Sequence, residues 1–134
     1  MNILFFLTPK SEVAYLYEHY TISQALEKME YHRYSSIPII NKEGKYIGTI
    51  TEGDLLWTLK NDFSLDFKSI EDVSINNISR RKDNRPVSIN ANIEDLISKA
   101  MNQNFVPVID DQDIFIGIIK RRDIIDYCYN KIKA

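Results

Sequence analysis

Hydrophobic and polar positions recur in the same order in the two halves of the chain. The segments GTITEGDLL at 48–56 and GIIKRRDII at 117–125 start 69 positions apart, and the same offset carries IPII at 37–40 onto VPVI at 106–109. Farther upstream the matching offset is 71, so the second copy lacks two residues between its first helix and the next strand. Loops tolerate such a change and packed elements do not. The sequence therefore predicts two copies of one structural unit.

The spacing of apolar residues predicts the order β-α-β-β-α in each copy. Thr21 with Gln24, and Asn92 with Asp95, have the spacing of a capping box, so a helix is expected to follow each pair. Segments that alternate with a period of two, or that are apolar and separated by turn residues, predict strands. These strands are expected at 13–17, 37–40 and 46–50 in the first copy, and at 86–89, 106–109 and 114–119 in the second.

The size of one copy bears on the domain organisation. A unit of about fifty residues buries too little surface to be stable by itself. The sequence therefore predicts a mixed α/β (α+β) protein whose two copies pack sheet to sheet. We expect an N-terminal segment with the first repeat at 1–59, a partly helical linker at 60–79, and the second repeat at 80–134.

Composition narrows the classes of function. Seventeen Lys and Arg against nineteen Asp and Glu give a net charge of −2, so there is no global basic field that would attract nucleic acid. The single cysteine, Cys128, excludes an intramolecular disulfide and has no metal-ligand spacing with His19 or His32. The apolar stretch at 1–7 is far shorter than the roughly 20 residues that span a bilayer, and we expect it to pack on the core. A cytoplasmic location is the natural expectation.

A motif at the end of each copy carries a family resemblance. In both halves an apolar strand with a proline leads through a turn to glycine, five residues and aspartate ahead of a helix, as in Gly48 to Asp54 and Gly117 to Asp123. This pattern resembles the CBS domain family over nearly the whole chain. The resemblance implies two tandem repeats related by pseudo-twofold symmetry, with two clefts between them that take adenosine-containing ligands. It implies a free-standing regulatory module, not an enzyme, that senses AMP, ADP or ATP and holds no tightly bound cofactor.

The resemblance also assigns contacts at the start of each last helix. The aspartate is expected to bind the ribose hydroxyls and the residue three positions earlier to contact phosphate, which gives Asp123 with Lys120 and Asp54 with Thr51. A carboxylate offers acceptors suited to a cis-diol, and the helix dipole favours negative charge at this place. Aspartate is also a common helix cap that binds no ligand, and this alternative stays open.

Each cleft is expected to combine residues from both repeats. By the resemblance, the Asp123 cleft is completed by Pro9, Ala14, Tyr34 and Ser35, and the Asp54 cleft by Arg80, Arg85, Gln103 and Asn104. Two residues depart from the family pattern. Lys120 replaces a hydroxyl and either strengthens a phosphate contact or fills the pocket, and Arg85 replaces a small residue, so the Asp54 cleft is either narrowed or suited to a more anionic ligand.

Two basic clusters leave further alternatives open. Residues 80–85 and 120–122, the latter including Arg122, either contact phosphate at the cleft mouths or form a solvated loop face. Besides a sensor of S-adenosylmethionine, NAD or cyclic di-AMP, the alternatives are a dimerisation or docking module with closed clefts, and nucleic-acid binding through these clusters. Trp57 and Tyr127, on the last helices, are expected at a dimer interface, and we expect a homodimer, with an unidentified protein partner also possible.

Overall fold

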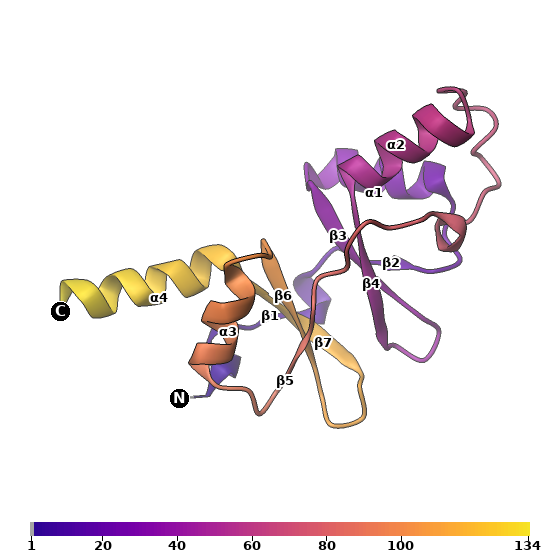
Figure 1. The fold of residues 1–134 in the computed structure, drawn as a ribbon. Helices are drawn as coiled ribbons and strands as arrows, with labels where there is room; N and C mark the ends of the chain where they lie inside the picture. The colour runs from indigo at the N-terminus through magenta and orange to yellow at the C-terminus, as the bar shows by residue number, and fades with distance from the viewer. Residues whose placement is uncertain (1) are drawn as a thin grey trace. The chain divides into compact units, whose positions relative to one another are not determined.

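A computed structural model describes residues 2–134, and these residues form two compact units. Ala14–Asp83 make up the first-repeat unit, and Asn84–Ala134 together with the residues up to Val13 make up the second-repeat unit. The segment before the first repeat therefore belongs to the unit of the second. Figure 1 traces this path along the ribbon.

The first-repeat unit follows the predicted order of elements. Its strands are β2 (Leu16–Tyr17), β3 (Ser36–Ile40) and β4 (Tyr46–Thr51), and its helices are α1 (Ile22–His32) and α2 (Glu52–Asp62), followed by the 3-10 turn η3 (Ile75–Asn77). β2 runs parallel to β3, and β3 pairs with β4 in antiparallel register. The first strand is shorter than the period-two pattern predicts.

The predicted helix starts are confirmed by their hydrogen bonds. At α1 the Gln24 amide donates to the Thr21 hydroxyl over 3.1 Å, and the Thr21 amide donates to the Gln24 side chain over 2.9 Å. Asn92 and Asp95 make the same reciprocal pair, at 2.9 and 3.1 Å, where α3 (Ile93–Ala100) begins. Each pair satisfies two amides that the first helical turn leaves without an intrahelical partner.

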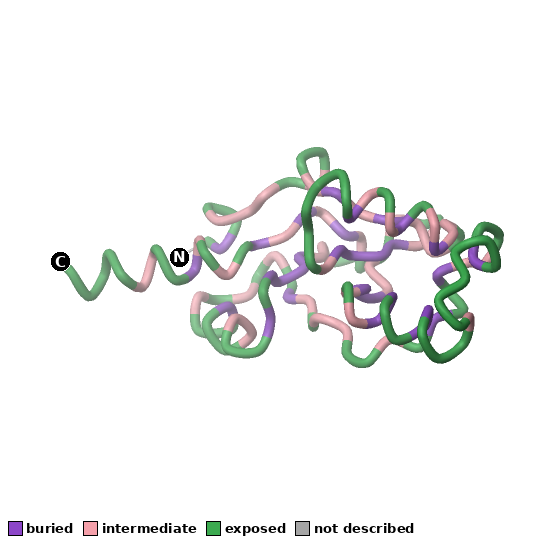
Figure 2. The backbone as a smooth tube through the Cα atoms, turned by 90° about the horizontal axis from the view of Figure 1, so that it is seen from above, coloured by how far each residue is buried: buried purple, intermediate pink, exposed green. Residues whose placement is uncertain are grey.

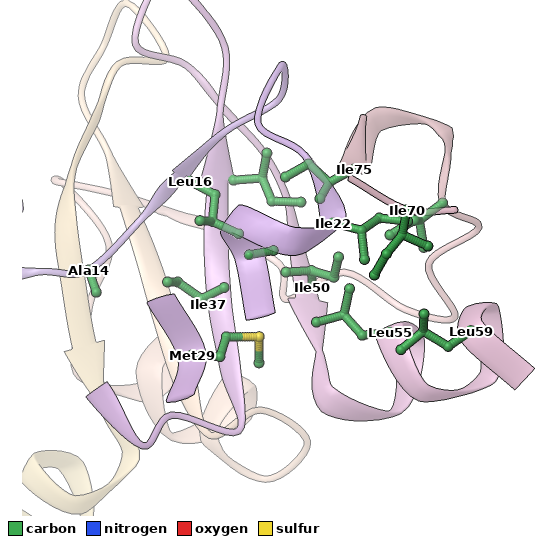
Figure 3. Packing of buried hydrophobic residues seen from close by; sticks show 13 residues of the cluster. Ala14, Leu16, Ile22, Met29, Ile37, Ile50, Leu55, Leu59, Ile70 and Ile75 are labelled. Carbon is green, nitrogen blue, oxygen red and sulfur yellow. The ribbon is translucent and has the colours of Figure 1, made fainter. Parts of the chain in front are cut away.

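Isoleucine and leucine side chains from every element of the first-repeat unit form its core (Figure 3). Ile37 and Ile50 from the sheet, and Leu55 from α2, are almost completely buried. The connecting segment after α2 contributes Ile70 and Ile75, which are fully buried as well. The expected linker is thus partly a structural element of this unit, because its isoleucines complete the core.

The second-repeat unit repeats this order and adds an N-terminal strand. It contains η1 (Ile3–Phe6), β1 (Thr8–Pro9), η2 (Lys10–Glu12), β5 (Val87–Ser88), α3, β6 (Phe105–Ile109), β7 (Phe115–Lys120) and α4 (Arg121–Lys133). The sheet order is β1-β7-β6-β5. The N-terminal apolar stretch packs inward only in part: Ile3 is fully buried in the core of this unit and Phe6 and Leu7 pack against it, whereas Leu4 and Phe5 are exposed. Figure 2 shows the opposite behaviour at the end of α4, where residues 129–134 are all exposed.

The prolines of the two apolar strands lie inside the strands and not at their starts. Pro38 pairs with Thr49, and Pro107 pairs with Ile118, each in the middle of an antiparallel ladder. The parallel neighbour of β3 pairs only with Ile39 and Ile40, so one side of the strand at Pro38 has no strand partner. A proline is tolerated at such a place because it has no amide hydrogen to donate.

Within residues 2–134, no helix combines the length and the apolar character required to cross a membrane.

Candidate functional site

The candidate aspartates occupy the same position in the two units. Asp54 is the third residue of α2 and Asp123 is the third residue of α4, each directly after the last strand of its repeat. The residues before the helices differ. Thr51 caps α2 with its side chain, whereas Lys120 stands at the cap of α4 and makes no side-chain cap bond. This difference sets the surroundings of the two carboxylates.

The Asp54 carboxylate is engaged by its own unit. One oxygen accepts the Thr51 amide over 3.0 Å, while the Thr51 hydroxyl accepts the Asp54 amide over 3.0 Å. The other oxygen accepts the backbone amide of Arg81 over 3.1 Å. Only 6% of the residue is exposed. The start of α2 is therefore a complete capping box, and the backbone amide of Arg81 is hydrogen-bonded to it.

The segment from Arg80 to Asp83 closes over β4 beside this helix start, and we call it the Arg80–Asp83 clasp. The Arg80 guanidinium donates to the two Asp83 oxygens, with Nε–Oδ1 at 2.7 Å and Nη2–Oδ2 at 3.2 Å. Asp83 Oδ1 also accepts the Thr49 amide over 2.9 Å. The Asp83 carboxylate raises the pKa of Arg80 above its ordinary value, because it stabilises the charged guanidinium through these hydrogen bonds.

Next to the clasp, β4 presents a half-buried phenol, that of Tyr46, and a glycine. The Tyr46 hydroxyl lies 2.6 Å from the Thr49 hydroxyl. Burial raises the pKa of Tyr46 far above its ordinary value, since removal from water disfavours the phenolate, and the nearby Asp83 charge adds to the rise. At Gly48 an added Cβ would lie 2.6 Å from both the Arg80 guanidinium and the Asp83 carboxylate. The clasp therefore fits against β4 only because this position has no side chain.

The Asp123 carboxylate has a different environment. It lines a pocket of about 410 Å³ that is formed within the second-repeat unit by α4 and the segment before β1. No described residue of this unit donates a hydrogen bond to its side chain, and the residue is only partly buried. The other residues of the pocket wall are Phe5, Phe6, Leu7, Thr8, Asp126, Tyr127 and Asn130.

Pairing between β1 and β7 holds the wall of this pocket in place. Thr8 is in register with Ile118, and Pro9 is in register with Gly117. Gly117 has a φ of +154°, and a Cβ there would collide with the Thr8 carbonyl oxygen. Pro9, a predicted site residue, thus belongs to the strand that flanks the Asp123 pocket. Farther along the wall, the rings of Phe6 and Tyr127 meet edge to face with centroids 5.3 Å apart.

Three residues predicted for the Asp54 cleft form a network inside the second-repeat unit. The buried Gln103 side chain accepts the Arg85 amide over 2.8 Å and donates to the Arg85 carbonyl over 3.1 Å. The Asn104 side chain accepts a hydrogen bond from Asn84 over 3.3 Å. Gln103 therefore fixes the backbone of Arg85, and the predicted role of these residues toward Asp54 stays a prediction.

The basic cluster at the start of α4 is divided between structure and solvent. Arg121 Nε donates to the carbonyls of Ala100 at 2.9 Å and Gln103 at 2.8 Å, so its guanidinium satisfies the end of α3. Lys120 and Arg122 are exposed. These two cations, and not the whole cluster, are available to an anionic ligand near Asp123.

The remaining predicted residues belong to the first-repeat unit. Ala14 is buried in the core of that unit. Tyr34 is exposed and stacks on His32, with centroids 5.3 Å apart, and Ser35 is exposed while its carbonyl accepts the Glu52 amide over 2.9 Å. Their predicted contribution to the Asp123 cleft stays a prediction.

Comparison with known proteins decides the family. The model of the CBS domain matches this chain twice, at residues 6–61 and 75–130, which together span most of its length. The chain belongs to the CBS domain family. It contains two tandem CBS repeats in a mixed α/β fold, as the repeat in the sequence predicts.

Solved structures of CBS proteins share this fold. A CBS domain protein of Streptococcus pneumoniae is 25% identical, with a TM-score of 0.85 over 97% of this chain and 88% of that one. CbpB of Listeria monocytogenes, in complex with c-di-AMP, is 21% identical, with a TM-score of 0.85 over 99% and 98% of the two chains. CBSX2 in complex with AMP is 21% identical, with a TM-score of 0.74 over 99% and 98%.

A curated relative matches this chain over a small part of a longer protein. L-aspartate semialdehyde sulfurtransferase of Methanocaldococcus jannaschii is 28% identical over 104 residues, which make up 78% of this chain and 19% of that protein. The chain thus spans about a fifth of the length of this relative. The catalytic activity in that name describes the longer protein, and none follows from it for the two CBS repeats here.

Sequence reasoning missed Asp83 and the aromatic wall of the Asp123 pocket. Asp83 follows three cations, Arg80 to Lys82, so the segment appears as a basic cluster although its acid pairs with Arg80. The contact of Asp83 with Thr49 joins positions 34 residues apart and leaves no periodic trace. Asp126 had a detectable signal, because it lies three residues after Asp123 and so on the same helical face.

Proposed function

We propose that this CBS protein is a regulatory module that binds an adenine nucleotide, with AMP, ADP or ATP preferred, at the start of α4. The observation that carries the proposal is the Asp123 carboxylate, which lines a pocket and has no hydrogen-bond donor among the described residues of its unit. The complexes of CbpB with c-di-AMP and of CBSX2 with AMP support a ligand that contains adenosine.

The chemistry of the pocket suggests how such a ligand is oriented. Asp123 accepts hydrogen bonds from the ribose hydroxyls, for which a carboxylate has suitable acceptors. The phosphates extend toward the exposed Lys120 and Arg122, because the acidic side chain of Asp126 also lines the pocket and repels anions there. The first amides of α4 offer additional donors to phosphate. The ring of Tyr127 lies on the same wall and supplies an apolar surface for a base.

Calorimetric titration tests this assignment. The panel contains AMP, ADP, ATP, S-adenosylmethionine, NAD and c-di-AMP, each titrated into the intact chain. Asp123→Asn keeps the shape of the side chain and removes its charge, so affinity for the bound ligand is expected to fall at least about tenfold, the loss of one charge-assisted hydrogen bond. Glu94→Gln, at an exposed acid in the first turn of α3, is the matched control and should bind like the wild type.

Three outcomes of the titration would contradict the proposal. Equal affinity of the Asp123→Asn variant and the wild type would remove Asp123 from the site. Absence of binding by every compound would favour the docking alternative, in which the repeats serve protein contacts only. Loss of binding in both variants would point to a general effect of charge and not to the pocket.

We also propose that the protein forms a homodimer through apolar grooves on its helices. One groove of about 440 Å³ lies between α3 and α4 and is lined by Ile97, Ala100, Met101, Ile124, Ile125, Cys128, Tyr129 and Ile132. A second, of about 390 Å³, lies between α1 and α2 of the other repeat. Exposed apolar surfaces of this kind favour protein contacts. Ile125→Asp should shift the mass measured by light scattering from dimer to monomer, whereas Lys131→Asp, on an exposed position of the same helix, should not.

A further inference from the structure

The Arg80–Asp83 clasp occupies the start of α2 in a way that has no counterpart at α4. Arg81 gives its amide to one Asp54 oxygen, and Thr51 gives its amide to the other. Asp54 is 6% exposed as a result, so little of its surface is left for a ligand. In the second-repeat unit the corresponding carboxylate, that of Asp123, opens into a pocket.

The clasp is held by side chains and not by a strand. Asp83 joins Arg80 to the Thr49 amide, and Arg80 Nη2 reaches the Ile47 carbonyl at 3.4 Å. These groups are partly exposed, with 19% of the Arg80 and 38% of the Asp83 side chain accessible. Ion pairs at such exposure are weakened by water and salt. The clasp therefore has a defined set of hydrogen bonds, and the free energy needed to open it is modest.

We propose that the Arg80–Asp83 clasp is an intramolecular stopper that must release Asp54 before this aspartate can bind a ligand. The inference rests on the proposed function, since it concerns which of the two helix starts is open to the same class of adenosyl ligand. The site at Asp123 binds the ligand directly. The site at Asp54 binds it only in the fraction of molecules whose clasp is open. Apparent affinity at Asp54 is reduced by that fraction.

Opening of the clasp also changes the connection between the two units. Asp83 is the last residue of the first-repeat unit, and Asn84 begins the second-repeat part of the chain. While the clasp is closed, the chain is fixed to β4 and α2 up to this boundary. Its release adds the residues from Arg80 to Asp83 to the free length of the connection. Ligand binding at Asp54 would thereby be coupled to the freedom of the segment that joins the repeats.

Amide exchange and proteolysis test closure without any ligand. In the wild-type chain the amides of Thr49 and Arg81 should be protected, and trypsin should cut slowly after Arg80, Arg81 and Lys82. Asp83→Ala removes the acceptor of the Thr49 amide and the partner of Arg80, whose neighbour Arg81 is bonded to Asp54, so exchange should rise at both amides, by about tenfold or more at Thr49, as expected for the loss of a charge-assisted hydrogen bond. Gly48→Ala should do the same, because its Cβ enters the space of the clasp.

Gly53→Ala is the matched glycine control. Its added Cβ would lie 3.6 Å from the Thr51 hydroxyl and 3.8 Å from the Trp57 ring, which are ordinary contacts. Exchange of the Thr49 and Arg81 amides should stay at the wild-type rate in this variant. Wild-type amides that exchange as fast as those of an unstructured peptide would overturn the clasp itself.

Binding at Asp54 is measured in chains that carry Asp123→Asn, in which binding at Asp123 is weakened. ATP, AMP and c-di-AMP should bind weakly to the single variant and about tenfold more tightly once Asp83→Ala is added. Further addition of Asp54→Asn should abolish this gain. A released clasp without any gain, or a gain that survives Asp54→Asn, would overturn the stopper. Failure of the proposed function is separate, because it appears as equal binding by the wild type and the Asp123→Asn variant.

Discussion

In each repeat, a glycine of the last strand lies against a short segment of chain. In the second repeat this contact is made with backbone, and in the first it is made with side chains. Gly117 of β7 meets the backbone of Thr8 and Pro9, which pair with it as strand β1. Gly48 of β4 meets the side chains of Arg80 and Asp83. Backbone pairing leaves Asp123 facing a pocket, whereas the side-chain clasp takes up Asp54. A repeated motif can therefore keep its geometry while one copy is open and the other is closed.

The largest expected effect on stability comes from replacing Gly117 and Gly48 with alanine. Gly117→Ala should lower the free energy of unfolding by about 3 kcal/mol, because strain at a positive φ adds to a collision with backbone. Gly48→Ala should cost only about 1 kcal/mol, since the ends of two flexible side chains can move aside. Urea denaturation of both variants measures the difference. Equal losses would show that the two coverings are equally rigid.

A second substitution, at the half-buried Tyr46, makes the first repeat resemble the second. Tyr46 corresponds to Phe115 at the repeat offset, and Thr49 corresponds to Ile118. Tyr46→Phe removes the hydroxyl partner of Thr49, which is 1% exposed, and should cost about 1–2 kcal/mol at neutral pH.

The same variant predicts a dependence on pH. The pKa of Tyr46 is raised in the folded protein, whereas the unfolded chain loses this proton near pH 10. Stability from this group is therefore complete below about pH 10 and falls as the pH rises further, by at most about 1.4 kcal/mol per pH unit. Urea denaturation from pH 8 to 11 should show a steeper decline for the wild type than for Tyr46→Phe. Parallel curves would mean that Tyr46 ionises equally in both states.

The smallest expected effect on stability sharpens the comparison of the helix starts. Lys120→Thr gives α4 the residue that caps α2, and its hydroxyl can form a capping box with Asp123. Stability should rise by about 1 kcal/mol, and nucleotide affinity should fall because Asp123 becomes engaged. Lys120→Ala removes the same cation without a cap, so the difference between the two variants measures the cap alone. Thermal unfolding and calorimetry of both variants provide the data.

The repeat allowed most of the fold to be predicted from the sequence. Local signals were sufficient for the capping boxes of α1 and α3 and for the order of elements, because these depend on residues a few positions apart. The positions of Asp54 and Asp123 at their helix starts followed from the doubled motif. The different surroundings of the two aspartates could not be predicted, because the same motif occurs at both.

Features that depend on distant residues could not be predicted. Strand β1 has two residues and no period, and its partner β7 lies more than one hundred positions later. Arg121 looked like part of a cationic site, but its guanidinium donates hydrogen bonds to carbonyl oxygens at and after the end of α3. Ile70 and Ile75 looked like a linker, although they are buried in the core. In each case the deciding contact is made by tertiary structure and has no local pattern.

The second-repeat unit is made of two separate stretches of the chain, and this affects the order of folding during translation. Ala14–Asp83 are continuous, so the contacts within this unit can form while the residues after Asp83 are still being translated. The second-repeat unit must wait, since its edge strand β1 is synthesised before Ala14 and β7, with which it pairs, after Asn84. Newly made chains should thus acquire the closed aspartate before the open one.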